Sequence, residues 1–574
     1  MSNSTMQEIE ADVVVVGGGG AGLRAAYEAA VAGARTVLVL KGRITKSGAT
    51  AFGVAELAGF SVPDGAADPQ DSPDVHYDDI MRAGKGCNDE RLVRVLVDEA
   101  VAAAEDIHRW GVEFITDPNT GKALVAMGDF ASRPRNRKIY HHGRPITVAL
   151  EREVRAAGVT VLEDNTVLGL LQGDDGVGGV LCLAGDGTRT CIRAGATVLA
   201  TGGAGQLFEF SLMPPDITGD GYALGYRAGA SLVNMEFIQA GFGTIKPSLN
   251  IIMAWFWALQ PGFIDRDGKP LLDGVLPPGL SVETVMKTKV KHYPFSASDE
   301  SRWLEIAAKR AMDEGRVTPL GGFRLDLRNV DESRLAPGSD LAVMWPVSKE
   351  WMRKKRLDFE NQPLEIGLFG HAINGGLVIS EYCETTVPGL LAVGETAGGP
   401  YGADRLGGNM LLNCQVFGRR AGRRAAELGR ARTARARKAA LPRVDYLLQA
   451  KGEQDVRGAI RRIKQAMTRD VLIIRNESGL NRAEQALATL HDEIVSGRFG
   501  AETVKEQIAL SEATNLLDTG RMIVAAARLR KETRGSHYRE DYPGLDPSMA
   551  KPVFIKREGD ACRVALRTYR EVMP

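Results

Sequence analysis

Three glycines near the N-terminus stand at the spacing that binds the diphosphate of a dinucleotide. Gly17, Gly19 and Gly22 form the pattern G-x-G-x-x-G. The first glycine permits a tight turn, the second lets backbone approach a pyrophosphate, and the third lets a helix pack closely on a strand. Amide groups and the partial positive charge at the start of that helix would hold the phosphate oxygens. These residues therefore indicate a dinucleotide-binding turn.

The segments around the glycines are those that such a turn requires. The valine run 13–16 is typical of a parallel strand buried on both faces. Residues 23–32 are alanine-rich and predict a helix, and residues 36–40 predict a second strand. A plain βαβ turn is the alternative, but the strand–turn–helix context favours dinucleotide binding. One departure is that Leu40-Lys41 stand where an acidic residue for the ribose is expected.

Other small-residue segments could also approach a flat ligand. Residues 46–53 form a loop of mostly small residues, for which an ordinary βα loop is the alternative. Thr201 and Gly202 end another apolar strand, and ligands bind at the carboxyl ends of strands in open α/β sheets. Asp220, at the expected start of a helix, could cap that helix, bind a ribose hydroxyl, or do both.

Length and composition exclude several classes of protein. A chain of 574 residues is too long for one core and predicts two to four domains. Lys+Arg and Asp+Glu are equal at 72 each, so no overall charge favours nucleic acid. The polar start has no secretory h-region, and no apolar run is long enough to span a membrane. We therefore expect a cytoplasmic protein without a membrane span.

Metal-binding patterns are not evident. The six cysteines are scattered, without the spacing of a zinc or iron–sulfur site. His141 and His142 are adjacent, but no carboxylate stands at ligand spacing, so we expect a surface loop there. We expect no metal, and electrons would have to be exchanged with another molecule. The arginine-rich stretch 419–443 is interpreted as a solvated helix and linker, with a nucleic-acid patch as the alternative.

The order of the expected elements predicts an α/β fold. A Rossmann-like pattern covers residues 1–240 and returns over 363–432. Residues 241–362 lose the alternation of strand and helix and are interpreted as an inserted α+β domain. Helical periodicity dominates 433–545, and 546–574 form a C-terminal tail. The expected architecture is a nucleotide-binding domain with an insertion, followed by a helical domain.

Nine segments match one family in the same order along the chain. The protein resembles the flavoprotein subunits of succinate dehydrogenase and fumarate reductase, with L-aspartate oxidase and the adenylylsulfate reductase α subunit as relatives. The strings GADRLGGN and RGSHYRED are the most specific. The matching segments are GGGGAGLRAA (17–26), TGGAG (201–205), TGDGYALGYRAGA (218–230), MEFIQ (235–239), GHAINGG (370–376), VPGLLAVGE (387–395), GADRLGGNMLLNCQVFGRRAG (402–422), IIRNESGL (473–480) and RKETRGSHYREDYP (530–543).

This resemblance implies FAD as the cofactor and identifies the insertion 241–362 as a mobile capping domain. Family members that attach FAD covalently carry a histidine in the loop matching 46–53. That loop has no histidine here, so we expect non-covalent FAD. The residues that the resemblance assigns to FAD are Gly17, Gly19, Gly22, Lys41, Ser47, Gly48, Ala49, Thr50, Val167, Thr201, Gly202, Asp220, Glu395, Arg405, Met410 and Leu411.

The resemblance also implies a reaction. Family members move a hydride between flavin N5 and a carbon next to a carboxylate. His371 and Arg405 match the pair that holds this carboxylate, a task for which the guanidinium fork is suited. Arg302 matches the proton-carrying arginine of the family if one residue is deleted, and an exposed helix arginine is the alternative.

A departure from the family concerns the substrate. The family has Gln-Phe-His-Pro where this chain has Gln239-Ala-Gly-Phe, and that histidine lies near the substrate. Its loss, together with the aromatic stretch 255–257, argues against succinate or fumarate. We expect FAD-dependent oxidation or reduction of a C–C bond in another carboxylate or carbonyl compound, with a ferredoxin or iron–sulfur protein as partner. The alternatives are an adenylylsulfate-reductase-like catalytic flavoprotein and a flavin-containing protein that binds or modifies RNA through residues 419–443.

Overall fold

The N-terminal strand β1 (Gln7–Val16) lies at the centre of a seven-stranded sheet. The computed structural model describes residues 6–53, 55–116, 121–335 and 340–573. Strand β1 pairs in parallel with β2 (Thr36–Val39) and β9 (Arg189–Leu199), and Val13–Val16 are buried. The predicted βαβ unit is therefore confirmed, with helix α1 (Gly20–Val31) between the two strands.

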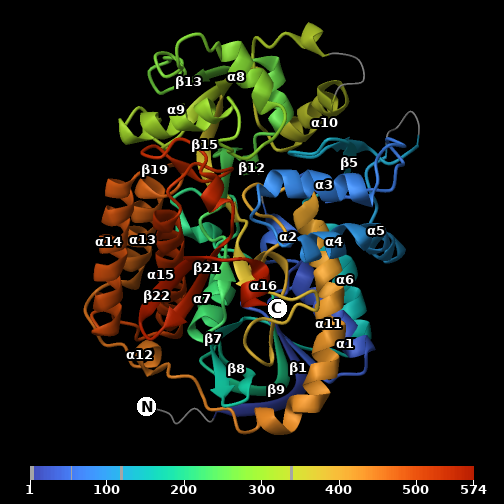
Figure 1. The fold of residues 1–574 in the computed structure, drawn as a ribbon, viewed down its shortest axis with the longest axis vertical. Helices are drawn as coiled ribbons and strands as arrows, with labels where there is room; N and C mark the ends of the chain where they lie inside the picture. Colours follow the sequence, from blue (N-terminus) through green and yellow to red (C-terminus); the bar gives the residue numbers. More distant parts are fainter. Residues whose placement is uncertain (1–5, 54, 117–120, 336–339, 574) are drawn as a thin grey trace.

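The remaining strands extend this sheet on both sides. Its order is β6-β2-β1-β9-β8-β7, and β17 pairs in parallel with the end of β9. Helix α11 packs against α1 and β9, and α6 packs against α1 (Figure 1). The other elements of this layer are β6 (Thr160–Leu162), β7 (Asn165–Gly173), β8 (Gly176–Ala184), β17 (Leu390–Ala392), α3 (Pro73–Gly84), α4 (Glu90–Asp98), α5 (Ala100–Arg109), α6 (Arg144–Ala156), α7 (Asp220–Arg227) and α11 (Asn409–Ala436).

A second sheet lies in the upper part of Figure 1 and belongs to the segment 238–373, which is called the cap here. Strands β11 (Ile238–Thr244) and β15 (Leu364–Ile373) pair antiparallel, where the chain enters and leaves this part. The sheet order is β12-β11-β15-β14-β13. The other elements of the cap are β12 (Asn250–Ile251), the 3-10 helix η2 (Ala254–Leu259), β13 (Gly262–Ile264), α8 (Val282–Lys289), α9 (Arg302–Asp313), β14 (Phe323–Asp326) and α10 (Asp340–Lys354).

Three long helices form the left side of the molecule in Figure 1. They are α13 (Val456–Asp470), α14 (Glu477–Val495) and α15 (Val504–Leu529), and they pack on one another. Helix α15 also contacts α7, which brings the helical part to the nucleotide-binding layer. The fold is thus mixed α/β, with a cap and a helical C-terminal part.

The C-terminal segment is more regular than its turn-rich sequence indicates. Strands β21 (Val553–Glu558) and β22 (Ala561–Leu566) form a hairpin, and β21 pairs with β10 (Leu232–Val233). The pairing gives the hairpin a place in a five-stranded sheet with β16 (Gly376–Val378) and β18 (Ala397–Gly398). The hairpin therefore packs against the nucleotide-binding half of the molecule.

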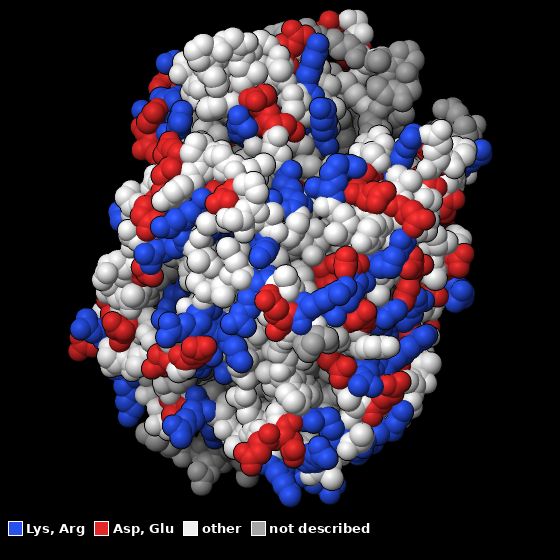
Figure 2. Space-filling view, in the orientation of Figure 1, with Lys and Arg blue, Asp and Glu red and all other residues white. Residues whose placement is uncertain are grey.

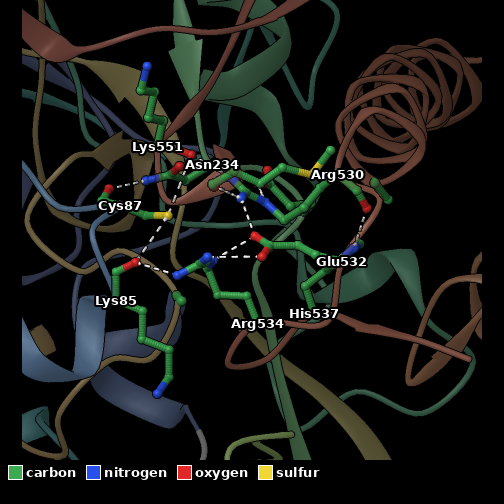
Figure 3. A network of polar contacts seen from close by, with 12 residues as sticks. Lys85, Cys87, Asn234, Arg530, Glu532, Arg534, His537 and Lys551 are labelled. Carbon is green, nitrogen blue, oxygen red and sulfur yellow. Dashed lines mark hydrogen bonds and ion pairs between the residues drawn. The ribbon is translucent and has the colours of Figure 1, made fainter. Parts of the chain in front are cut away.

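The string 530–543 forms a buried polar network (Figure 3). Arg530 donates to Glu236 at 2.7 Å and pairs with Glu532, and Arg534 pairs with the same Glu532 at 2.6 Å. Arg534 also donates to the backbone oxygen of Lys85 at 2.8 Å. Glu532 is buried between two guanidinium groups and Glu236 meets one of them, so the network holds distant segments together and gives the string a structural role.

The arginines of α11 are engaged within the chain. Arg419 and Arg420 both contact the carboxylate of Glu99 at 2.7 Å, and Arg423 pairs with Glu28 at 2.9 Å. On the face drawn in Figure 2, basic and acidic side chains alternate rather than separate. Among the helices that the structure describes, none is both long and apolar enough to cross a bilayer.

Candidate active site

A large cavity runs from the N-terminal glycine turn to the cap sheet. Its walls come from the ends of β1, β2 and β9, the segment 47–59, strand β15 and the start of α11. Gly22 and Arg302 do not line it. The other residues predicted from the sequence do: Gly17, Gly19, Lys41, Ser47, Gly48, Ala49, Thr50, Val167, Thr201, Gly202, Asp220, His371, Glu395, Arg405, Met410 and Leu411.

The glycine turn has the backbone that a bound pyrophosphate needs. Gly17 has φ +109°, and a Cβ there would stand 2.3 Å from the carbonyl oxygen of Ala200. A Cβ on Gly22 would stand 1.9 Å from the oxygen of Gly17, so Gly22 allows α1 to pack against the turn. Helix α1 begins at the cavity wall, and its first turn offers amide groups to an anion. The residues present therefore fit the phosphates of FAD.

Lys41 is the centre of an ion cluster near the end of β2. Its ammonium group donates to Asp220 and Glu512, each at 2.9 Å, and to Thr218 at 2.7 Å. Burial alone would lower the pKa of Lys41, but the two carboxylates outweigh it and raise this pKa. Lys41 is therefore a fixed positive charge in this wall.

One sequence-based alternative for this cluster is wrong, and one member of the cluster was not predicted. Asp220 makes no capping hydrogen bond at α7; its carboxylate accepts from Lys41, Thr218 and Asn515 instead. Glu512, on α15, was not predicted to be near the nucleotide-binding layer. Nothing in the local sequence marks it, because its position depends on how the helical part docks.

Glu395 is a buried carboxyl group in the cavity wall. Burial raises its pKa to about 7, although a hydrogen bond from the Ile373 amide and the charge of Arg405 act in the opposite direction. Its Oε1 accepts from Ile373 N at 3.1 Å, and a Cβ on Gly203 would stand 2.2 Å from this oxygen. Glu395 thus changes its charge near neutral pH, next to the cofactor cavity.

His371 and Arg405 meet at the cap end of the cavity, as the sequence predicted that they would lie together. Strand β15 has an irregular register against Gln239 and Ala240 that leaves His371 without a paired residue, and such bulges redirect side chains. The Arg405 Nη2 lies 3.4 Å from His371 Nε2. Burial, followed by the charge of Arg405, lowers the pKa of His371 to about 3, so its ring is neutral.

Arg405 is itself buried among neutral groups. Its Nε donates to Gln239 Oε1 at 2.9 Å, and its Nη1 donates to the backbone oxygen of Leu406 at 3.3 Å. Only 8% of Arg405 is exposed, yet no carboxylate pairs with it among the residues that the structure describes. A guanidinium group in this position is suited to hold an anionic or carbonyl oxygen from outside.

The third predicted catalytic residue lies elsewhere. Arg302 begins α9, where its Nη1 donates to the backbone oxygen of Ala297 at 3.0 Å. Its Nη2 stands 3.5 Å from Glu300, and its side chain is 29% exposed. The structure therefore brings Arg405 and His371 together but leaves Arg302 outside the cavity walls.

Sequence reasoning missed several residues of the cap end. Tyr293 and Asp129 line the cavity although no motif marks them, and Lys138 lines it from the basic segment 132–145, for which a channel wall and a solvated loop were the alternatives. Trp255 was singled out as part of an aromatic stretch, and its ring also lines the cavity while its Nε1 donates to Ser348 at 3.1 Å. No sequence spacing relates these four positions, so their proximity becomes visible only in the folded structure.

Comparisons with known proteins agree with this geometry. Residues 12–250 match the family model described as "FAD binding domain", and residues 460–570 match "Fumarate reductase flavoprotein C-term". One chain of the fumarate reductase (CoM/CoB) from Methanothermobacter marburgensis is 30% identical, over 96% of this chain and 97% of its own length. L-aspartate oxidase from Streptomyces coelicolor is 32% identical, over 98% and 93%.

Solved structures show the same architecture. Sdh1 of Mycobacterium smegmatis superposes with a TM-score of 0.81 at 26% identity, covering 98% of this chain and 94% of its own. FrdA of Escherichia coli quinol fumarate reductase gives a TM-score of 0.79 at 25% identity, with 98% and 97% covered. Adenylylsulfate reductase from Archaeoglobus fulgidus, at 20% identity and a TM-score of 0.76, shares the fold.

Proposed function

Because the chain belongs to the family of fumarate reductase and succinate dehydrogenase flavoproteins and is an FAD-dependent oxidoreductase, we propose that it oxidises or reduces a C–C bond next to a carboxylate or carbonyl group. The observation that carries this proposal is Arg405. It is a buried guanidinium group on the cavity wall whose partners are all neutral. An anionic or strongly polarised oxygen of a substrate would complete its environment.

The chain's own residues would bind and orient this substrate. Arg405 would hold the substrate oxygen and draw electron density from the adjacent double bond. Neutral His371 would keep the guanidinium in place through its Nε2 without adding a second positive charge. FAD bound along the glycine turn supplies the hydride acceptor or donor. The cap end would exclude water through Trp255 and the apolar residues Ile251 and Met253.

We further propose that FAD is held without a covalent bond and that succinate and fumarate are not the substrates. The loop 46–53 offers no histidine for attachment, and Gly241 stands where the resembling family has its substrate-contacting histidine. Arg302 as the proton carrier, a cytoplasmic location and a ferredoxin or iron–sulfur partner remain predictions. The structure of Sdh1 is a complex with UQ1, and FrdA belongs to a quinol fumarate reductase, which supports electron exchange with a second molecule.

The test is anaerobic reduction of the purified yellow protein, followed by a panel of enoates, enones, keto acids and amino acids. A substrate will reoxidise the reduced flavin or reduce the oxidised flavin without air. Arg405→Met should lower kcat/KM about 10²–10⁴-fold, because two charge-assisted hydrogen bonds contribute about 3–6 kcal/mol together. The variant should keep its FAD, which acid precipitation should release into solution.

A matched control is Arg310→Met, which removes an exposed guanidinium of α9 that is paired at 3.5 Å with Glu540. This variant should turn over like the unmodified protein. If Arg405→Met retained FAD and full turnover, the role proposed for Arg405 would be wrong.

A further inference from the structure

A buried phenol stands beside the proposed carboxylate-binding pair without a hydrogen-bond partner. Tyr293 lines the cavity and is 5% exposed. Its ring meets His371 edge-on, with centroids 5.6 Å apart. Among the residues that the structure describes, none accepts from or donates to the Tyr293 hydroxyl. A buried hydroxyl that makes no hydrogen bond lowers stability by about 1–3 kcal/mol, and an acceptor on a bound ligand would remove this cost.

The imidazole of His371, next to this phenol, also has a buried polar atom without a hydrogen-bond partner among the described residues. His371 Nε2 faces the guanidinium of Arg405, which can only donate, so the ring proton belongs on Nδ1. That Nδ1 is buried and has no partner in the described part of the chain. Two donors, a phenol and an imidazole N–H, therefore stand next to one another at the cap end of the cavity, both unsatisfied.

Gly241 creates the space for the phenol. A Cβ at position 241 would stand 2.8 Å from Cζ of Tyr293 and 3.1 Å from its hydroxyl oxygen. These two positions therefore exclude each other: a side chain on strand β11 at 241 and the Tyr293 ring cannot both occupy this volume. The glycine in Gln239-Ala-Gly-Phe thus provides the volume that the ring of Tyr293 fills.

The charged groups around Tyr293 determine which kind of ligand oxygen can bind to its hydroxyl group. The Asp129 carboxylate accepts from the backbone N–H of Tyr293 at 2.6 Å and also lines the cavity. Glu305, buried and paired with Lys289, is a second acidic group near the ring. Burial and these two carboxyl groups keep the phenol un-ionised, since together they raise its pKa well above the usual value. Because Lys289 compensates Glu305, Asp129 is the carboxylate that would repel a second one beside Tyr293, whereas a neutral carbonyl oxygen would not be repelled.

We propose that Tyr293 is a substrate-contacting residue that donates a hydrogen bond to a neutral carbonyl oxygen, so that the site selects a keto acid over a dicarboxylate. This inference rests on the proposed function, because it takes Arg405 as the group that holds the carboxylate. It adds the second point of recognition. Lys138, from another segment, and Lys291, two residues before Tyr293, line the same cavity and would favour entry of an anionic substrate.

The test uses three four- or five-carbon probes with the holoenzyme. Trans-4-oxopent-2-enoate carries one carboxylate and one ketone, fumarate carries two carboxylates, and crotonate carries one carboxylate and a methyl group. Dissociation constants come from the change in the flavin absorbance spectrum, and rates come from anaerobic reoxidation of reduced flavin. We expect the oxo acid to bind at least 10-fold tighter than fumarate.

Tyr293→Phe removes only the hydroxyl group. It should weaken the oxo acid about 5–10-fold, as expected for one hydrogen bond, and leave crotonate unchanged. Its melting temperature should equal or exceed that of the unmodified protein, which separates a substrate contact from a structural role. Tyr226→Phe is the control: this tyrosine is also buried, but it lies on α7 next to Cys562 and should bind all three probes normally.

Gly241→Ala provides a second variant, because its methyl group would displace the Tyr293 ring. It should weaken the oxo acid as Tyr293→Phe does, and the double variant should add little. Equal effects of Tyr293→Phe on oxo acid and crotonate, or a preference for fumarate in the unmodified protein, would overturn the inference while Arg405 still governs binding. If no probe bound, or Arg405→Met bound all three normally, the proposed function itself would fail, and this inference with it.

Discussion

Replacement of Glu395 by glutamine tests the electrostatics of the cofactor cavity. Burial raises the pKa of this carboxyl group to about 7 from an ordinary value of 4.5. Glutamine has nearly the same shape and keeps an oxygen that can accept from the Ile373 amide, now 3.1 Å from Glu395. The substitution therefore removes the ionisation and little else.

The sign follows from proton binding. Below pH 4.5 the group is protonated in both folded and unfolded chains and contributes nothing. Between 4.5 and 7 only the unfolded chain ionises, so stability falls as the pH rises, and above 7 the loss is complete. The full difference corresponds to about 3 kcal/mol, and water in the cavity would reduce it to about 1–3 kcal/mol.

Glu395→Gln apoprotein should therefore be more stable than the unmodified apoprotein at pH 8 and equal to it at pH 4.5. For a chain of 574 residues, 3 kcal/mol corresponds to about 2–3 °C in Tm. Differential scanning calorimetry of both proteins from pH 4.5 to 8.5 measures the difference directly. A constant Tm difference over this range, or a less stable variant at pH 8, would refute the argument from burial.

Two further substitutions test the nucleotide end. Gly22→Ala should weaken FAD binding about 5–150-fold, because its methyl group would stand 1.9 Å from the Gly17 oxygen and overpacking costs about 1–3 kcal/mol. The FAD content after gel filtration measures this effect, and full retention of FAD would contradict it. Lys41→Met should destabilise the protein by about 2 kcal/mol, because Asp220 and Glu512 lose the cation that each meets at 2.9 Å. The loss should shrink toward pH 4, where the carboxyl groups take up protons, and a pH-independent change in Tm would count against the ion cluster.

The nucleotide end could be predicted from the sequence because its chemistry resides in the backbone. Gly17 and Gly22 are needed whatever the surrounding side chains are, since a Cβ at either position meets a carbonyl oxygen. The strand–turn–helix order that carries them is local in sequence. Lys41 was assigned only through the resemblance, and its partner Glu512 could not be predicted, because 471 residues separate the two.

The substrate end could be predicted only in part. Arg405 and His371 each stand in a specific string, so the resemblance found both, and the structure explains their meeting through the bulge opposite Gln239. Tyr293 lies in the segment between α8 and α9 with no periodic pattern. The space for its ring depends on Gly241, which lies earlier in the chain on strand β11. The hairpin β21–β22 was not predicted for a related reason, because its partner strand β10 is only two residues long.

Arg405 differs from other buried arginines of the chain in the charge of its partners and in its place on the cavity wall. Arg135 is buried between Asp71 and Asp79, and Arg530 between Glu236 and Glu532, so each has its counter-charge within the fold. Arg475 has neutral partners, and burial lowers its pKa to about 10, but it does not line the cavity. Arg405 combines neutral partners with a place on the cavity wall. Because an unpaired buried charge is costly, an anionic group of a ligand at this position would stabilise the guanidinium of Arg405.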